Sequence, residues 1–227
     1  MNTQNQYTKP MTIVRGGLRR PNWICRNVKQ NVVLGRDKSG SMRGQKAKDA
    51  STASLDLVSE LAEPSNKDGF QIAVVDFSDS SNIVNNLEKA AALNGKVSSL
   101  SVGGSTNITA GLEDAFSILE KAKGNNQANV TFLRPVVIVF TDGQHNVGPA
   151  PHDVANRLKG IADLVTVAFG SDADEALLRS LASTPQHFYR CTNGRELRSF
   201  LAAVGATMTA TLQAGTNATQ ALTMIQQ

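Results

Sequence analysis

The chain has 227 residues, 41% of them hydrophobic and 19% charged, which suits one domain of ordinary size with a buried core. No apolar run approaches the roughly 20 residues that a membrane-spanning helix needs, and residues 1–10 lack the apolar stretch of a signal peptide. The net charge of +4 is unevenly distributed. From these features we expect a cytoplasmic protein with no membrane partner.

Residues 1–30 form a basic arm. They contain six Lys or Arg residues and no Asp or Glu, so the total of +4 leaves −2 for the rest of the chain. Such an arm can be solvated, can dock onto an acidic protein, or can contact nucleic acid. Only Tyr7 and Trp23 are available there to stack on bases, and the charges are spread out. We therefore expect no nucleic-acid partner.

From residue 31 onward, apolar strand patterns alternate with helical patterns. The runs 136–140 and 164–169 lack an in–out alternation, as expected of strands that are covered on both faces. Residues 79–81 leave too little chain for a helix, which predicts an antiparallel hairpin at one edge of the sheet. The predicted strands are 31–36, 70–78, 82–87, 135–141, 163–170 and 186–191.

The segments between the strands carry apolar residues at helical spacing. Asn193 and Glu196 have the spacing of a capping box at the start of the last helix, and Asp172 and Glu175 have it before a shorter one. The predicted helices are 43–62, 109–123, 152–161, a short helix around Leu177, and a final helix through 197–208.

This alternation predicts an α/β fold. We expect a doubly wound, mostly parallel six-stranded sheet with one antiparallel edge strand and helices on both faces. Ligands of such sheets bind beyond the carboxyl ends of the strands, where the strand order reverses. We assign residues 1–30 to the basic arm, 31–210 to one domain and 211–227 to a polar C-terminal tail.

The two cysteines, Cys25 and Cys191, are expected to be free thiols. Cys25 precedes the first predicted strand and Cys191 follows the last, so a parallel sheet places them about a strand length apart. A disulfide needs Cα atoms within about 7 Å. Free thiols are typical of a reducing compartment.

Small oxygen-bearing side chains follow three predicted strands or loops. Asp37, Ser39 and Ser41 come directly after the apolar run 32–34, Thr106 lies in a Gly-Gly-Ser-Thr-Asn loop, and Asp142 follows the apolar run 136–140. Hard cations such as Mg²⁺ prefer oxygen ligands of this kind. Because Asp37 and Asp142 would end the two strands that flank the reversal of strand order, we expect these side chains to converge there.

The set Asp-x-Ser-x-Ser, then Thr, then Thr-Asp-Gly resembles the metal-ion-dependent adhesion site of von Willebrand factor A domains, and the resemblance covers roughly residues 31–208. It implies a Rossmann-like fold and a bound Mg²⁺ (or Mn²⁺ or Ca²⁺). It also implies that Ser39, Ser41 and Thr106 contact the metal directly or through water, while Asp37 and Asp142 orient them. Few direct carboxylate contacts leave such a cation short of charge, so a partner protein supplies an Asp or Glu as the last ligand.

Two residues depart from the family pattern. Arg36 stands where an apolar residue is usual, and Lys38 adds a second cation to the loop. A buried guanidinium needs a carboxylate partner or a route to solvent. Either cation can weaken metal binding or attract an acidic partner residue, so we expect a metal site that is retained but weak. The alternative is a degenerate site without metal. We expect the partner to contact Arg36, Lys38, Gly104 and His145.

The resemblance implies a protein-binding module and no enzyme. Residues 39–44 look like those of bacterial tellurite-resistance and stress-operon proteins, which implies an adaptor whose partner is a kinase or phosphatase. A co-chaperone of a MoxR-type AAA+ ATPase is the alternative. A metal-dependent hydrolase using His145 is less favoured, because no Gly-x-Ser-x-Gly elbow surrounds Ser39 or Ser41. An aspartate phosphotransferase would need a second acid two residues after Asp37, where Ser39 stands.

Overall fold

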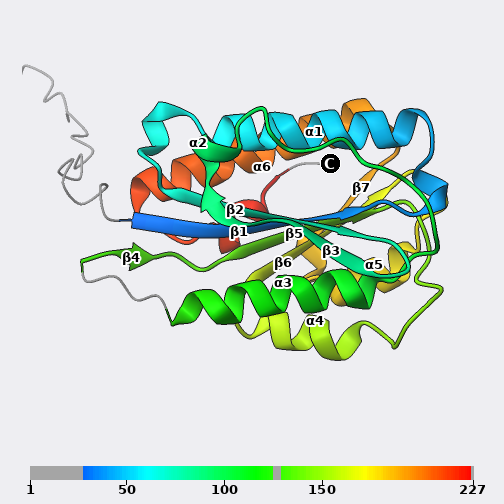
Figure 1. The fold of residues 1–227 in the computed structure, drawn as a ribbon. Coiled ribbons are helices and arrows are strands. Elements are labelled where there is room, and N and C mark those ends of the chain that lie inside the picture. The colour runs from blue at the N-terminus through cyan, green and yellow to red at the C-terminus, as the bar shows by residue number, and fades with distance from the viewer. Residues whose placement is uncertain (1–27, 125–128, 226–227) are drawn as a thin grey trace, which may run out of the picture.

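A computed structural model describes residues 28–124 and 129–225 (Figure 1). The predicted basic arm falls on residues 1–30, so all of it but Val28–Gln30 lies outside the described residues, and Cys25 lies outside them too. The strands are β1 (Val28–Asp37), β2 (Phe70–Phe77), β3 (Ser81–Lys89), β4 (Thr131–Phe132), β5 (Val136–Thr141), β6 (Asp163–Phe169) and β7 (Phe188–Cys191). The helices are α1 (Gln45–Leu61), α2 (Ala90–Leu93), α3 (Ile108–Lys123), α4 (His152–Lys159), α5 (Glu175–Leu181), α6 (Gly194–Ala214) and α7 (Thr219–Leu222).

The sheet confirms the predicted fold class. Its strand order is β3-β2-β1-β5-β6-β7, and β4 pairs with the start of β1. The β2–β3 pair is antiparallel, and the other pairs are parallel. After β1, the chain adds β2 and then β3 on one side of β1. It later adds β5, β6 and β7 on the other side of β1. The strand order therefore reverses between β1 and β5. The two-residue strand β4 was not predicted.

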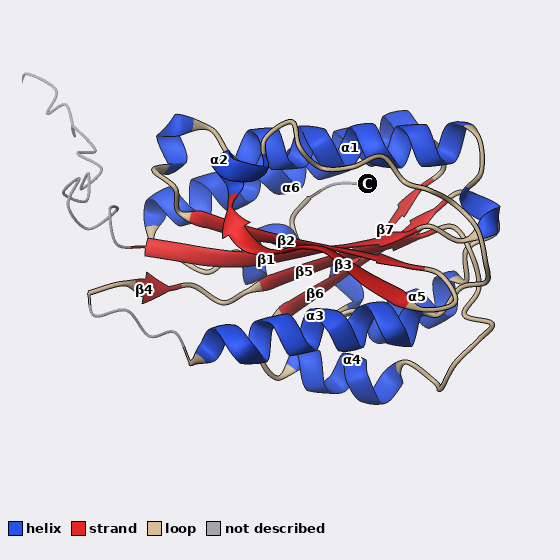
Figure 2. Cartoon of the chain, viewed as in Figure 1, coloured by secondary structure: helices blue, strands red, loops and turns tan. Residues whose placement is uncertain are grey.

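Helices cover both faces of the sheet, so the domain has three layers (Figure 2). Helices α1, α2, α6 and α7 pack on one face, and α3, α4 and α5 pack on the other. Alternate residues of each inner strand serve the two cores: Val32 and Leu34 face α1 and α6, while Val33 faces α3. Because both faces of the inner strands are buried, their sequences lack an alternation of apolar and polar residues. None of the helices in the described part is long and apolar enough to span a membrane.

The predicted boundary at residue 210 falls inside α6, which runs to Ala214. The residues that follow pack on the core: Ala218 and Leu222 are fully buried, and the Tyr189 hydroxyl donates a hydrogen bond to the Leu222 carbonyl. The described part of the predicted polar tail is therefore integral to the domain. At the other end, β1 begins at Val28, three residues before the predicted domain boundary.

His187 fixes this C-terminal segment through a buried, neutral ring. Its Nε2 lies 3.1 Å from the Thr219 carbonyl oxygen and its Nδ1 lies 2.8 Å from the Thr184 hydroxyl oxygen. A carbonyl only accepts, so Nε2 carries the proton and Nδ1 accepts from Thr184. Burial lowers the pKa of His187 below its ordinary value of 6.5, although Asp163 opposes this shift.

The His187 ring predicts a loss of stability in mild acid. The unfolded chain takes up a proton at this ring near pH 6.5, whereas the folded protein does so only at lower pH. The free energy of unfolding should therefore fall as the pH drops below about 6.5, by up to about 1.4 kcal/mol per pH unit. Urea denaturation between pH 7.5 and 5.5 measures this slope. His187→Gln should flatten it and the exposed control His152→Gln should keep it, whereas equal slopes in the wild type and His187→Gln would contradict the assignment.

Candidate metal centre

The structure brings the five predicted metal-site residues to one edge of the sheet. Asp37 is the last residue of β1, and Ser39 and Ser41 follow in the turn that leads to α1. Thr106 directly precedes Asn107, the N-cap of α3, and Asp142 directly follows β5. Strands β1 and β5 are neighbours, and the strand order reverses between them. Asp37, Ser39, Ser41 and Asp142 therefore lie at or just after the carboxyl ends of these two strands, and the loop before α3 adds Thr106.

A chain of hydrogen bonds links the two serines to Asp142. The Ser41 hydroxyl donates to Asp142 Oδ1 over 2.6 Å, and the oxygens of Ser39 and Ser41 lie 3.0 Å apart. Because the proton of Ser41 is committed to Asp142, Ser39 donates to Ser41. Both serine protons are therefore used in hydrogen bonds within the centre. The remaining lone pairs of the two serine oxygens are available to a cation.

Asp37 is held by the same kind of contacts on the other side. Its Oδ1 accepts from the Ser39 backbone N–H at 2.6 Å and its Oδ2 accepts from the Thr141 hydroxyl at 2.5 Å. Burial raises the pKa of the Asp37 carboxyl above its ordinary value; these hydrogen bonds oppose the rise and the charge of Asp142 adds to it. A positive charge beside this buried carboxylate would favour its ionised form.

Gly143 leaves an open space between Thr106 and Ser41. A Cβ atom at Gly143 would lie 3.0 Å from the Thr106 hydroxyl oxygen and 3.5 Å from the Ser41 hydroxyl oxygen. Two hydroxyls from distant parts of the chain thus approach one point, which a side chain at position 143 would block. Thr106 is itself placed by its backbone, which exchanges hydrogen bonds with Asn146.

The chemistry of this donor set fits a hard divalent cation. Such ions take oxygen ligands, and Mg²⁺ retains several waters, so it needs few protein contacts. In the described part of the chain, no group of three or more His, Cys, Asp or Glu side chains is placed to hold a metal. Metal binding here would therefore depend on the three hydroxyls and two carboxylates. Most structural zinc sites use thiolate and imidazole ligands, which this set lacks.

The sequence analysis missed one member of this cluster. The Lys46 ammonium lies 2.5 Å from Asp142 Oδ2, and the Asp142 side chain is 0% exposed. Lys46 is the second residue of α1, and its side chain joins the start of this helix to the residue after β5. A helical pattern in the sequence places Lys46 near the site, but it does not show which carboxylate the long side chain meets.

Arg36 is a correction to the predicted partner contacts. Its side chain is fully buried, and its guanidinium makes a two-point ion pair with Asp76, with Nε–Oδ1 and Nη2–Oδ2 distances of 2.7 and 3.0 Å. Its Nη1 donates to the Ser98 carbonyl at 2.9 Å. A guanidinium enclosed in this way presents no charge to a partner. Arg36 instead ties β1 to β2 and to the loop that leads towards Thr106.

The other three predicted partner contacts lie on the rim of the centre. Gly104 is exposed and Lys38 is half-buried, and the Gly104 carbonyl accepts from the Gly40 backbone N–H at 2.9 Å. His145 is half-buried, and its Nδ1 accepts from the Ile108 backbone N–H at 3.2 Å. This bond makes His145 an anchor between the loop after β5 and the start of α3. Contact of any of these residues with a partner stays a prediction.

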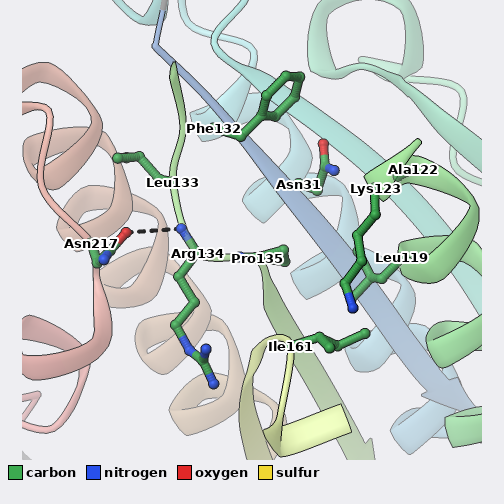
Figure 3. A pocket seen from close by; sticks show the side chains of 10 residues that line it. All are labelled: Asn31, Leu119, Ala122, Lys123, Phe132, Leu133, Arg134, Pro135, Ile161 and Asn217. Atoms are coloured by element: carbon green, nitrogen blue, oxygen red, sulfur yellow. Dashed lines mark hydrogen bonds between the residues drawn. The ribbon is translucent and has the colours of Figure 1, made fainter. Parts of the chain in front are cut away.

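A separate cavity lies at the opposite end of the sheet (Figure 3). It has a volume of about 380 Å³ and is bordered by Asn31, Phe132, Pro135 and the end of α3. Beside it, the Asn217 side-chain oxygen accepts from the Arg134 backbone N–H at 2.8 Å. Asn31 lies near the start of β1, whereas Asp37 lies at its end, so this cavity contains none of the predicted site residues.

Comparison with known proteins identifies a family. A sequence model described as the von Willebrand factor type A domain matches residues 31–203. Inter-alpha-trypsin inhibitor heavy chain H1 of Mesocricetus auratus is 29% identical over 157 residues, which cover 65% of this chain and 17% of that protein. The same protein of Sus scrofa is 29% identical over 161 residues, again 17% of its length. The chain thus spans about a sixth of the curated relatives that it matches.

Solved structures share the fold at low sequence identity. Proximal thread matrix protein 1 from the mussel byssus, in a structure with a zinc-occupied MIDAS motif, has a TM-score of 0.64 and 22% identity over 81% of this chain and 46% of that chain. A von Willebrand factor type A protein from Catenulispora acidiphila has a TM-score of 0.64 and 22% identity, covering 82% of this chain and 43% of that chain.

Proposed function

Because this chain belongs to the von Willebrand factor type A domain family, we propose that it is a binding module that captures a partner protein through a divalent cation. The observation that carries the proposal is the convergence of Ser39, Ser41 and Thr106 beside Asp37 and Asp142. A cation bound there would have an open coordination position, which a carboxylate of a partner protein could fill. Mg²⁺ is the metal that we favour, with Mn²⁺ or Ca²⁺ as alternatives.

The charges around the centre support an acidic partner group. Lys38 and Lys46 are half-buried and Arg43 is exposed, and all three lie within five residues of a predicted metal ligand. Complementary charges of this kind favour the approach of an Asp or Glu side chain and disfavour basic surfaces. The hydroxyl donors add no negative charge that would repel that carboxylate.

The proposal extends to the setting in which the chain acts. We propose a cytoplasmic adaptor in a bacterial stress or phospho-signalling system, with a kinase, phosphatase or AAA+ ATPase as the partner. The resemblance of residues 39–44 to stress-operon proteins supports this finer assignment. A non-catalytic role fits the site, because Ser39 and Ser41 are hydrogen-bonded to each other and Ser41 to Asp142. Among the described residues, no hydrogen bond joins either serine to a histidine.

The test removes one donor and leaves the fold intact. Thr106→Val keeps the side-chain shape and the backbone bonds to Asn146 but replaces the hydroxyl with a methyl group. We expect the immobilised wild-type protein to retain a partner in Mg²⁺ and to lose it in EDTA, and we expect Thr106→Val to lose it in both. The matched control is Thr52→Val, a half-buried position on α1 away from the predicted metal ligands. Retention of the same partner by correctly folded Thr106→Val, judged by circular dichroism, would refute the proposal.

A further inference from the structure

Lys46 lies outside the predicted donor set, yet it makes a direct contact in the centre, and this contact does not stabilise its own helix. It stands in the first turn of α1, a turn that contains no acidic residue. The amino-terminal end of a helix carries a partial positive charge, so a cation there is unfavourable for the helix itself. The position of Lys46 is instead explained by its ion pair with Asp142, at 2.5 Å.

The surrounding backbone is shaped for this lysine. Gly170 follows β6 with a φ of +98°, a conformation that favours glycine. A Cβ atom at Gly170 would lie 3.3 Å from the Lys46 ammonium nitrogen and 4.0 Å from Asp142 Cβ. The missing side chain thus opens the path along which Lys46 reaches the carboxylate. Its side chain remains 32% exposed, so the ammonium can move out towards solvent.

We propose that Lys46 is a built-in counter-ion of Asp142 that competes with the divalent cation and so sets the metal affinity of the centre; this inference rests on the proposed function. Both oxygens of Asp142 are engaged, Oδ1 by Ser41 and Oδ2 by Lys46. A fully buried carboxylate needs a positive partner or hydrogen bonds. A cation that drew on the same carboxylate would repel the ammonium a few ångströms away.

The proposal also gives a physical reason for the weak metal binding that the sequence analysis predicts. The sequence suggested Arg36 and Lys38 as the cations that oppose the metal. Arg36 is neutralised by Asp76, and its guanidinium is turned into the contact with β2. Lys46, by contrast, contacts a predicted member of the centre. The competing charge that touches a predicted member of the centre therefore comes from α1.

The test compares Lys46→Met with a charge-matched control. Methionine keeps the unbranched stem and removes the ammonium, and Lys48→Met removes one charge from an exposed position of the same helix. By titration calorimetry with Mn²⁺ after EDTA treatment, we expect Lys46→Met to bind at least about tenfold more tightly than the wild type, since one nearby unit charge is removed. Lys48→Met should stay within about twofold, since exposed charges are screened, and Lys46→Arg should resemble the wild type.

A second measurement reads out the counter-ion without metal. In EDTA, the melting temperature of Lys46→Met should be lower than the melting temperatures of the wild type and of Lys48→Met. Added Mn²⁺ should raise the melting temperature of Lys46→Met more than it raises that of the other two proteins. Equal or weaker Mn²⁺ binding by folded Lys46→Met would overturn the role of Lys46 while leaving a metal-binding module in place. Failure of both the wild type and Lys46→Met to bind Mn²⁺ at millimolar concentration would overturn the proposed function itself, and this inference with it.

Discussion

Replacing Asp76 with alanine is expected to lower the free energy of unfolding by about 3–5 kcal/mol, the cost of leaving a buried charge without its partner. Arg36 is fully buried, and Asp76 satisfies two of its nitrogens. The remaining bond, to the Ser98 carbonyl, carries no full countercharge. Urea denaturation monitored by circular dichroism measures the loss directly.

Two controls separate this effect from the loss of any ion pair. Glu113→Ala removes the carboxylate of an exposed two-point pair with Arg157 and should cost less than about 1 kcal/mol. The double variant Arg36→Met with Asp76→Leu should recover much of the lost stability, because apolar residues can replace a buried pair. An Asp76→Ala protein within 1 kcal/mol of the wild type would show that the guanidinium finds solvent or another acceptor.

Gly143→Ala is expected to weaken metal binding by about 10- to 100-fold, the range seen when the surroundings of a metal site are altered, without removing any donor. The added methyl group would lie 3.0 Å from the Thr106 hydroxyl oxygen and 3.5 Å from the Ser41 hydroxyl oxygen. It therefore occupies the space that lies beside both hydroxyl oxygens. The backbone bond from Gly143 to the Thr141 hydroxyl oxygen, 3.2 Å long, does not need the glycine.

Gly103→Ala is the matched control for this prediction. Gly103 lies in the Thr106 loop, and a Cβ atom there meets nothing within 4 Å. Mn²⁺ titration should give wild-type affinity for Gly103→Ala and a weakened isotherm for Gly143→Ala, with similar melting temperatures in EDTA. An unchanged Mn²⁺ affinity in Gly143→Ala would show that the cation does not bind beside these two hydroxyls.

The sequence predicted the fold and the convergence of the candidate site residues, because both follow from the order and the ends of the strands. Parallel strands bring their carboxyl ends to one edge, so Asp37 and Asp142 meet there although they are far apart in the chain. The apolar runs identified β5 and β6, and the Asn193–Glu196 spacing identified the start of α6, where Asn193 accepts from the Glu196 backbone N–H.

Features that depend on register or on side-chain reach could not be predicted. Arg36 and Asp76 are direct partners in the β1–β2 register, which the separate strand patterns do not reveal. Lys46 meets Asp142 only because of its long side chain and the glycine across from it. The segment after α6 is mostly polar in sequence, yet the buried side chains of Ala218 and Leu222 and a hydrogen bond to the Leu222 carbonyl hold it against the domain.

Anomalous diffraction from crystals of the full chain soaked in Mn²⁺ tests the central claim most directly. We expect a single strong peak beyond the ends of β1 and β5, bounded by the hydroxyls of Ser39, Ser41 and Thr106, with oxygen atoms as its direct ligands. In the same crystals, Lys46 should have left Asp142. Crystals that retain the Lys46–Asp142 pair and show no anomalous peak among the three hydroxyls at millimolar Mn²⁺ would contradict the account.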